Sequence, residues 1–183
     1  MDADDPIIVF RADPLWADEF RAIGTTLRRA LGPLAVRIDH VGSTSVPDLD
    51  AKPIIDIQVS VAQLEPVSRY APALEALGYS FRPENPDRSK RFFRRHEGPR
   101  GVHIHVRRSG SVDEQLTLLL RDYLRTHPTN ADGYARVKWK LAEVHRNDRE
   151  GYVDAKSPTV WALLRKADEW SQATGWEPGP SDA

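Results

Sequence analysis

The stretch of sequence that decides the fold reads His40-Val41-Gly42-Ser43-Thr44-Ser45-Val46-Pro47. The segment 35–41, with β-branched residues at Val36, Ile38 and Val41, ends at the start of this stretch, and a more apolar segment rich in isoleucine follows at 54–59. Runs of this length and composition, separated by Gly, Pro and Ser, are typical of strands. We therefore predict a strand at 35–41, a loop at 42–52 and a second strand at 54–59.

The predicted loop carries a glycine followed by three hydroxyl side chains, Ser43, Thr44 and Ser45. Because Gly42 has no Cβ, the backbone can approach a ligand closely at this position. Successive backbone N–H groups, together with the three hydroxyls, would form a cradle for phosphate oxygens. An ordinary strand-to-helix turn capped by Ser or Thr is the structural alternative.

A single acid, Asp56, interrupts the otherwise apolar second strand. A buried charge is costly unless it is paired or bound to a metal. Side chains alternate along a strand, so Asp56 and Gln58 share one polar face, where a divalent cation could bind. Pairing of Asp56 with a buried lysine or arginine is the alternative.

Two histidines, His103 and His105, flank Ile104 in a later predicted strand, so both imidazoles point to the same face. Two imidazoles with this spacing could bind zinc or another transition metal, or one of them could act as an acid or base. Structural histidines held by hydrogen bonds are the alternative.

The rest of the chain alternates helical and extended patterns. Asp13-Pro14 begins a run with apolar residues at helical spacing, which ends at Gly32-Pro33. The other predicted elements are a short strand at 7–10, a helix at 64–77, a strand pair at 91–96 and 102–107, and helices in the final third, the last starting at Ser157-Pro158. This order predicts an α/β protein in which helices pack against a sheet.

Length and composition predict one domain at 7–172, with 1–6 and 173–183 as flexible tails. The 183 residues include no cysteine, which excludes a thiol nucleophile, a cysteine zinc site and disulfides. The formal net charge of −1 gives no general attraction to nucleic acid or membranes. No apolar run is long enough to span a bilayer and the start is acidic, so we expect a cytoplasmic protein without a membrane partner. The pattern leaves the oligomeric state open.

Basic residues are concentrated in the predicted hairpin, where the segment from Arg88 to Arg108 holds eight of them and one acid. Such a patch suits a polyanion such as a nucleotide or RNA, although a solvated hairpin face is equally consistent with the pattern. Five further basic candidates lie apart in the chain, and the sequence does not reveal which of them converge on the site: Lys52, Arg121, Arg125, Lys138 and Lys156.

Two segments, Asp39–Pro47 and Ala51–Ile57, resemble the signature of the GrpB family, as do residues 13–16, 103–106 and several downstream positions. That family is similar to the nucleotidyltransferase superfamily, in which a Gly-Ser pair is followed by two carboxylates one residue apart. The resemblance implies an α/β (α+β) fold, with a nucleotidyltransferase-like mixed sheet, flanking helices and a C-terminal helical lobe.

The resemblance also implies roles for the site residues. Gly42 and Ser43 would hold nucleotide phosphates and Asp56 would bind the metal, but Gln58 stands where a second carboxylate is expected. A neutral amide is a weak magnesium ligand, which leads to the hypothesis that His103 and His105 replace the missing acids. The nearby Asp48 and Asp50 have the spacing of the missing pair, but they follow Gly42 too soon, so we expect them on the surface.

These observations together predict a nucleotidyltransferase-like protein that binds a nucleotide or another phosphorylated ligand with Mg²⁺ or Mn²⁺, or with Zn²⁺. Asp56 and His105 are the predicted catalytic residues, and Lys52 would neutralise phosphate charge. A non-catalytic phosphate-binding or nucleotide-binding module is one alternative. The resemblance links it to coenzyme A metabolism, because similar domains occur joined to dephospho-CoA kinases. A metal-dependent hydrolase is the other.

Overall fold

A computed structural model describes residues 6–95 and 100–183. Five strands form one mixed sheet in the order β1-β2-β5-β4-β3, in which β2 and β5 are parallel and the other neighbours antiparallel. The strands are β1 (Ala35–Val41), β2 (Ile54–Val61), β3 (Ser80–Phe81), β4 (Lys90–Arg95) and β5 (Gly101–Arg108). The predicted α/β class with a mixed sheet is confirmed.

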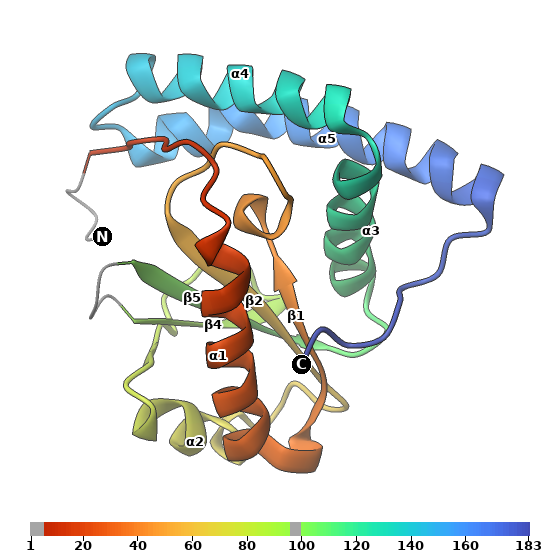
Figure 1. Ribbon diagram of the computed structural model, residues 1–183. Coiled ribbons are helices and arrows are strands. Elements are labelled where there is room, and N and C mark those ends of the chain that lie inside the picture. Colours follow the sequence, from red (N-terminus) through yellow and green to blue (C-terminus); the bar gives the residue numbers. More distant parts are fainter. Residues whose placement is uncertain (1–5, 96–99) are drawn as a thin grey trace.

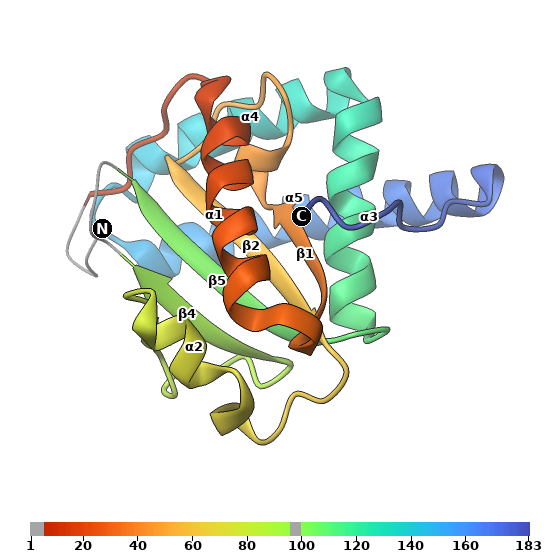
Figure 2. The same cartoon turned by 60° about the horizontal axis from the view of Figure 1, so that its bottom comes forward.

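Helices cover the sheet from two sides. They are α1 (Leu15–Leu31), α2 (Ala71–Ala76), α3 (Val112–Thr126), α4 (Pro128–Val144) and α5 (Arg149–Thr174). Figure 1 shows α1 and α2 against one face of the sheet, while α3, α4 and α5 form a helical lobe. The turned view in Figure 2 shows α1 crossing over the strands, with the lobe behind them. The sheet therefore has a helix-covered face and a face directed towards the lobe.

The main core lies between α1 and the sheet. Ile38, Ile57 and Ile104 from three neighbouring strands are fully buried, and Phe20 and Leu27 of α1 pack with them. Side chains alternate along a strand, so the residues directly before and after each of these isoleucines point to the opposite face, towards the lobe. The lobe-side face thus carries Asp39 of β1, Asp56 and Gln58 of β2, and His103 and His105 of β5. His40 of β1 lies on the other face, where it stacks on Phe20 of α1.

The predicted start of the first helix is confirmed, since the Asp13 carboxylate accepts a hydrogen bond from the Leu15 N–H at 3.0 Å. The predicted strand at 7–10 is wrong, because only Phe10 forms a β-bridge, with Ala51. Prolines shorten the predicted helix at 64–77 to a 3₁₀ turn at Val67–Arg69 followed by α2.

The last helix begins earlier than predicted. Asp148 caps α5, accepting a hydrogen bond from the Gly151 N–H at 2.8 Å, and the helix continues through Pro158. Proline lacks an N–H and usually starts or bends a helix. The long helix tolerates it here, so the proline marks an interior position rather than a first turn.

Asp50 is not a surface residue, contrary to the prediction, whereas Asp48 is exposed. The Asp50 carboxylate accepts hydrogen bonds from the Ala12 N–H at 3.0 Å and from Trp139 Nε1 at 2.8 Å, and it pairs with Arg11. Asp50 therefore connects the segment before α1 to α4 through hydrogen bonds.

The segment 173–183, predicted to be a flexible tail, returns from the end of α5 to the free edge of β1 (Figure 1). The Ala183 N–H donates to the Ile38 carbonyl at 3.1 Å, and Asp182 accepts from the His40 N–H at 3.0 Å. These contacts cover the edge strand, and the mobility of the segment stays a prediction.

Part of the predicted N-terminal tail, 1–5, lies outside the described residues, as does 96–99 in the predicted hairpin. Within the described part of the chain, no helix combines the length and the apolar character that crossing a membrane requires.

Candidate functional site

The turn after β1 brings backbone and carboxylate together. Gly42 has a positive φ of 70°, in a region that residues with a side chain rarely occupy. A Cβ at this position would lie 2.6 Å from Oδ2 of Asp56. Glycine is therefore required here both for the backbone conformation and for the close approach of the carboxylate.

Asp56, His103 and His105 form one cluster on the lobe side of the sheet. The parallel register of β2 and β5 places Asp56 beside His103 and Gln58 beside His105. Asp56 Oδ1 lies 3.3 Å from His103 Nδ1 and 3.2 Å from His105 Nε2. The candidate ligand atoms of these three side chains all lie within 4.8 Å of one another, so one cation could contact all three.

The electrostatics of this cluster favour an ionised carboxylate. Burial by itself would raise the pKa of Asp56, but hydrogen bonds with His103 and His105 outweigh it and hold that pKa well below its usual range. Burial lowers the pKa of His105, against the opposing effect of Asp56. A neutral imidazole and an ionised carboxylate are the forms that bind metals.

The donor set indicates which metals fit. Two imidazoles and one carboxylate suit Zn²⁺, Mn²⁺ and related transition metals, whereas Mg²⁺ prefers oxygen ligands and several waters. The Phe92 ring lies 5.1 Å from the His103 ring and 5.3 Å from the His105 ring, which shields one side of the cluster.

Gln58 does not join this cluster. Its side chain is fully buried, and Nε2 donates a 3.4 Å hydrogen bond to the backbone carbonyl of Glu114 on α3. Gln58 also lies opposite Asp39 in the sheet, and both Asp39 and Glu114 are fully buried acids. A neutral amide avoids placing a third carboxylate among them.

The three loop hydroxyls have different surroundings. Thr44 Oγ1 donates to the Ile54 carbonyl at 2.9 Å, and Ser45 Oγ donates to the Gly42 carbonyl at 2.6 Å. Ser43 instead lies beside Tyr134, whose pKa burial raises to about 12, and both residues line one cavity. The hydroxyl protons of Thr44 and Ser45 are thus committed within the loop, and phosphate contacts by all three residues stay a prediction.

Three lysines from separate elements converge beside this loop. The ammonium groups of Lys52 and Lys156 lie 5.3 and 5.7 Å from the centre of the Tyr152 ring. Lys138 Nζ lies 4.7 Å from the centre of the Tyr134 ring and donates to the Asp50 carbonyl. Burial, reinforced by Lys156, lowers the pKa of Lys52 to about 8 and that of Lys138 to about 7.

The positive charge of these lysines is poorly compensated. In residues 6–95 and 100–183, no ion pair joins Lys52, Lys138 or Lys156 to a carboxylate, in contrast to Lys90, which pairs with Asp87 at 3.2 Å. Asp56 is the acid whose field raises the pKa of Lys52. Clustered, partly buried ammonium groups of this kind attract an anionic ligand.

Sequence reasoning missed Tyr134 and Tyr152, the aromatic partners of these lysines. Each tyrosine precedes its lysine, Lys138 or Lys156, by four positions within one helix, so tyrosine and lysine lie on one helix face. The repeated Tyr-x-x-x-Lys spacing was the available signal.

The basic hairpin is partly neutralised locally. Arg91 pairs with Glu65, Arg100 with Asp13, and Arg107 with Asp87 at 3.6 Å. These ion pairs reduce the positive field of the hairpin, and RNA binding there stays a prediction.

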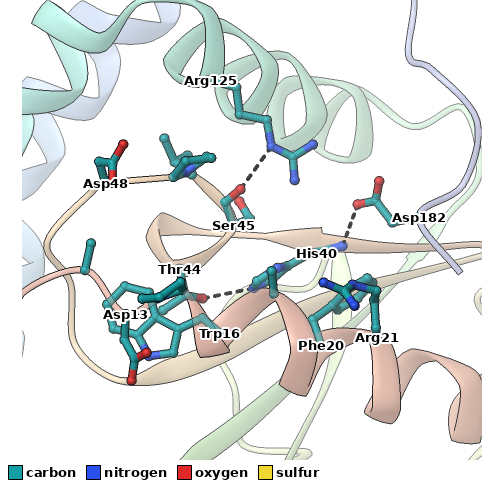
Figure 3. Close-up of a pocket in the computed structure, with 15 residues that line it drawn as sticks. Asp13, Trp16, Phe20, Arg21, His40, Thr44, Ser45, Asp48, Arg125 and Asp182 are labelled. Carbon is teal, nitrogen blue, oxygen red and sulfur yellow. Dashed lines mark hydrogen bonds between the residues drawn. The ribbon is translucent and has the colours of Figure 1, made fainter.

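A cavity of about 560 Å³ lies on the α1 side of the loop (Figure 3). His40 forms part of its wall, stacked on Phe20 with ring centres 4.7 Å apart and hydrogen-bonded to Thr44 at 3.1 Å. Burial lowers the pKa of His40 to about 4, so its ring is neutral at pH 7. Neither Asp56 nor the lysine cluster lines this cavity, so the candidate chemistry lies elsewhere.

The family model for GrpB protein matches residues 6–166, which include the turn, the cluster of Asp56, His103 and His105, and the three lysines. The chain belongs to the GrpB family. A UPF0157 protein of Pseudomonas aeruginosa is 42% identical over 168 residues, spanning 90% of this chain and 69% of that protein. The crystal structure of a conserved GrpB protein from Enterococcus faecalis has a TM-score of 0.81 and 31% identity, over 89% of this chain and 99% of the other.

Two further similarities connect this chain to proteins with other names. A cytoplasmic RNA terminal U-transferase has a TM-score of 0.50 at 21% identity, over 70% of this chain and 40% of the other, which supports the nucleotidyltransferase-like fold alone. The dephospho-CoA kinase of Mycobacterium tuberculosis is 32% identical over 198 residues, spanning 94% of this chain and 49% of the kinase. This chain thus spans about half the length of that kinase.

Proposed function

We propose that this GrpB-family protein binds a nucleotide or another phosphorylated ligand together with a divalent metal, and that it carries out nucleotidyl or phosphoryl transfer. The observation that carries the proposal is the convergence of Lys52, Lys138 and Lys156 beside the Asp56 cluster, without an ion pair to a carboxylate among the described residues. Phosphate groups are the ligands that match uncompensated lysines next to a carboxylate-histidine cluster.

The proposed binding mode uses residues from both sides of the turn. Ser43 and the backbone N–H groups after Gly42 would bind phosphate oxygens, while the lysines would neutralise their charge. In phosphoryl transfer the protein acts mainly by positioning the reactants and stabilising negative charge, which this constellation could do. Tyr134, which lies beside Ser43, would help to position its side chain.

Asp56, His103 and His105 would hold the metal, which would supply charge neutralisation and polarise a phosphate oxygen. Asp56 is kept ionised by its histidine partners, so it is ready to bind a cation at neutral pH. His105, whose pKa is lowered by burial, offers an unprotonated ring nitrogen for the same purpose or for accepting a proton. The buried Gln58 argues for a single metal rather than a pair.

A binding module without turnover is the second candidate, since Gln58 is buried away from the cluster and leaves one carboxylate there. The similarity to part of a dephospho-CoA kinase favours a coenzyme A precursor as the ligand of such a module. A metal-dependent hydrolase would use the same residues.

The experiment that separates these functions is an assay of pyrophosphate and phosphate release from each nucleoside triphosphate with Mn²⁺, Mg²⁺ or Zn²⁺, with and without an RNA acceptor. Acceptor-dependent release supports transfer, and release without acceptor indicates the hydrolase. Binding without release indicates the module. Asp56→Asn should abolish release, whereas Asp48→Asn, at an exposed position of the same loop, should not. Absence of both binding and release would contradict the proposal.

A further inference from the structure

A second cavity, of about 290 Å³, lies directly beside the Gly42 turn, between α3, α5 and the loop after β1. Six aliphatic side chains line it: Val46, Leu116, Leu120, Leu124, Val160 and Leu164. Trp161, which is 62% exposed, also contributes to the wall. Small-molecule sites usually have volumes of about 300–1,000 Å³. The cavity is therefore large enough for part of a ligand rather than for a large cofactor.

Two of the polar side chains that line this cavity, Thr117 and Arg121, are already engaged within the protein, Arg107 donates to Ser89 Oγ at 2.6 Å, and Asp113 is exposed to solvent. Thr117 Oγ1 donates to the Asp113 carbonyl at 2.7 Å, and Arg121 pairs with Asp122 at 2.7 Å and with Asp182 at 2.9 Å. A ligand group with many hydrogen-bonding atoms would lose its bonds to water here without replacement, which is costly. The walls thus favour a hydrocarbon group over a nucleobase or a sugar.

One wall of the cavity is shared with the candidate phosphate site. Gly42, Ser43 and Tyr134 line the cavity. The Tyr134 ring contacts Lys138 Nζ at 4.7 Å from its centre, and the Gly42 backbone contacts the Asp56 carboxylate. A ligand with its phosphates at the lysines can therefore extend past Ser43 and Tyr134 into the aliphatic cavity.

We propose that this cavity holds the hydrocarbon part of the phosphorylated ligand, so that the substrate class is a phosphate or pyrophosphate ester of an apolar alcohol. The inference rests on the proposed function for its phosphate half, and it adds the group to which the phosphates are attached. Each methylene that the cavity buries should tighten binding about fourfold.

Calorimetric titration in the presence of Mn²⁺ tests this with four probes: inorganic pyrophosphate, dimethylallyl diphosphate, geranyl diphosphate and ATP. Affinity should rise from pyrophosphate to dimethylallyl to geranyl diphosphate, by at least about tenfold overall. Filling the cavity with Leu120→Trp should reduce the affinity for geranyl diphosphate to that for pyrophosphate, while pyrophosphate binding stays unchanged.

Two further variants keep this test interpretable. Leu116→Trp fills the cavity from another partly buried position of α3, in case Leu120→Trp does not fold. Val144→Trp adds the same side chain at a position that is 68% exposed and does not line the cavity, and it should leave all affinities unchanged.

The outcomes separate the inference from the function on which it rests. If the wild-type protein binds pyrophosphate, and binds geranyl diphosphate no more tightly than pyrophosphate, the cavity inference alone is overturned. The same holds if the filled variants lose ATP binding instead, because the cavity would then hold a nucleoside. If no phosphate probe binds to wild type, the proposed function falls and the inference falls with it.

Discussion

The backbone of Gly42 and the carboxylate of Asp56 lie so close together that a Cβ at position 42 would be 2.6 Å from Oδ2. The turn is expected to hold phosphate, and Asp56 is expected to hold the metal. Their close packing means that a side chain added to the turn would shift the carboxylate. This displacement can be tested separately from backbone strain.

Gly42→Ala should both destabilise the protein and weaken metal binding. Forcing alanine into this backbone conformation costs about 1–3 kcal/mol, and the added methyl group pushes Asp56 away from His103 and His105. Gly110→Ala is the matched control, since Gly110 also has a positive φ, of 73°, but an added Cβ there would meet no atom within 4 Å. Chemical denaturation and Mn²⁺ titration should show lost metal affinity for the first variant and unchanged affinity for the second.

Gln58→Glu should destabilise the protein rather than restore a two-carboxylate site. The new acid would be buried near Asp39 and Glu114, and it could no longer donate to the Glu114 carbonyl. We expect a loss of about 1–3 kcal/mol at pH 7. Burial raises the pKa of such an acid, so the loss should shrink at pH values where the carboxyl is protonated. Gln63→Glu, at an exposed position, should be close to neutral, and an equal effect of both would contradict this account.

Lys138→Met should change how stability depends on pH. Burial lowers the folded-state pKa of Lys138 from 10.5 to about 7. Between these values the unfolded chain binds the proton and the folded protein does not, so the Lys138 contribution makes wild-type stability rise with pH from about 7 to about 10.5. The variant should lack this rise and should be relatively most stable near and below pH 7. Denaturation across this pH range should show no such difference for Lys140→Met, whose side chain is exposed.

Asp182→Ala should loosen the segment that covers β1. It removes the acceptor of the His40 N–H and one of the partners of the buried Arg121, which should cost about 1–2 kcal/mol. Hydrogen exchange should show faster exchange at the His40 amide. Glu177→Ala, at an exposed position of the same segment, should leave it unchanged. Equal exchange in both variants would mean that Asp182 does not hold the segment.

Local patterns were sufficient to predict much of the fold. Alternation at 54–59 predicted Asp56 and Gln58 on one face, and the spacing of His103 and His105 predicted both imidazoles on one face of their strand. The parallel neighbour relation of β2 and β5 could not be predicted in this way, because it depends on long-range pairing. That pairing is what brings the histidines to Asp56.

Features that depend on distant partners were missed. Asp50 looked like a loop acid because its partners Arg11 and Trp139 are 39 and 89 positions away. The convergence of the lysines likewise arises from three different segments of the chain. Pro158 suggested a helix start, but packing of the long α5 overrides this local preference.

The most direct test of the central claim, that the Asp56 cluster and the lysines bind one ligand together, is calorimetric titration with inorganic tripolyphosphate in the presence and absence of Mn²⁺. For wild type the metal should tighten tripolyphosphate binding at least about tenfold, because linked sites strengthen each other reciprocally. Asp56→Asn should remove this enhancement and retain weak metal-independent binding, whereas Lys138→Met should weaken both. Tripolyphosphate binding that is absent, or that is the same with and without Mn²⁺ in wild type, would contradict the account.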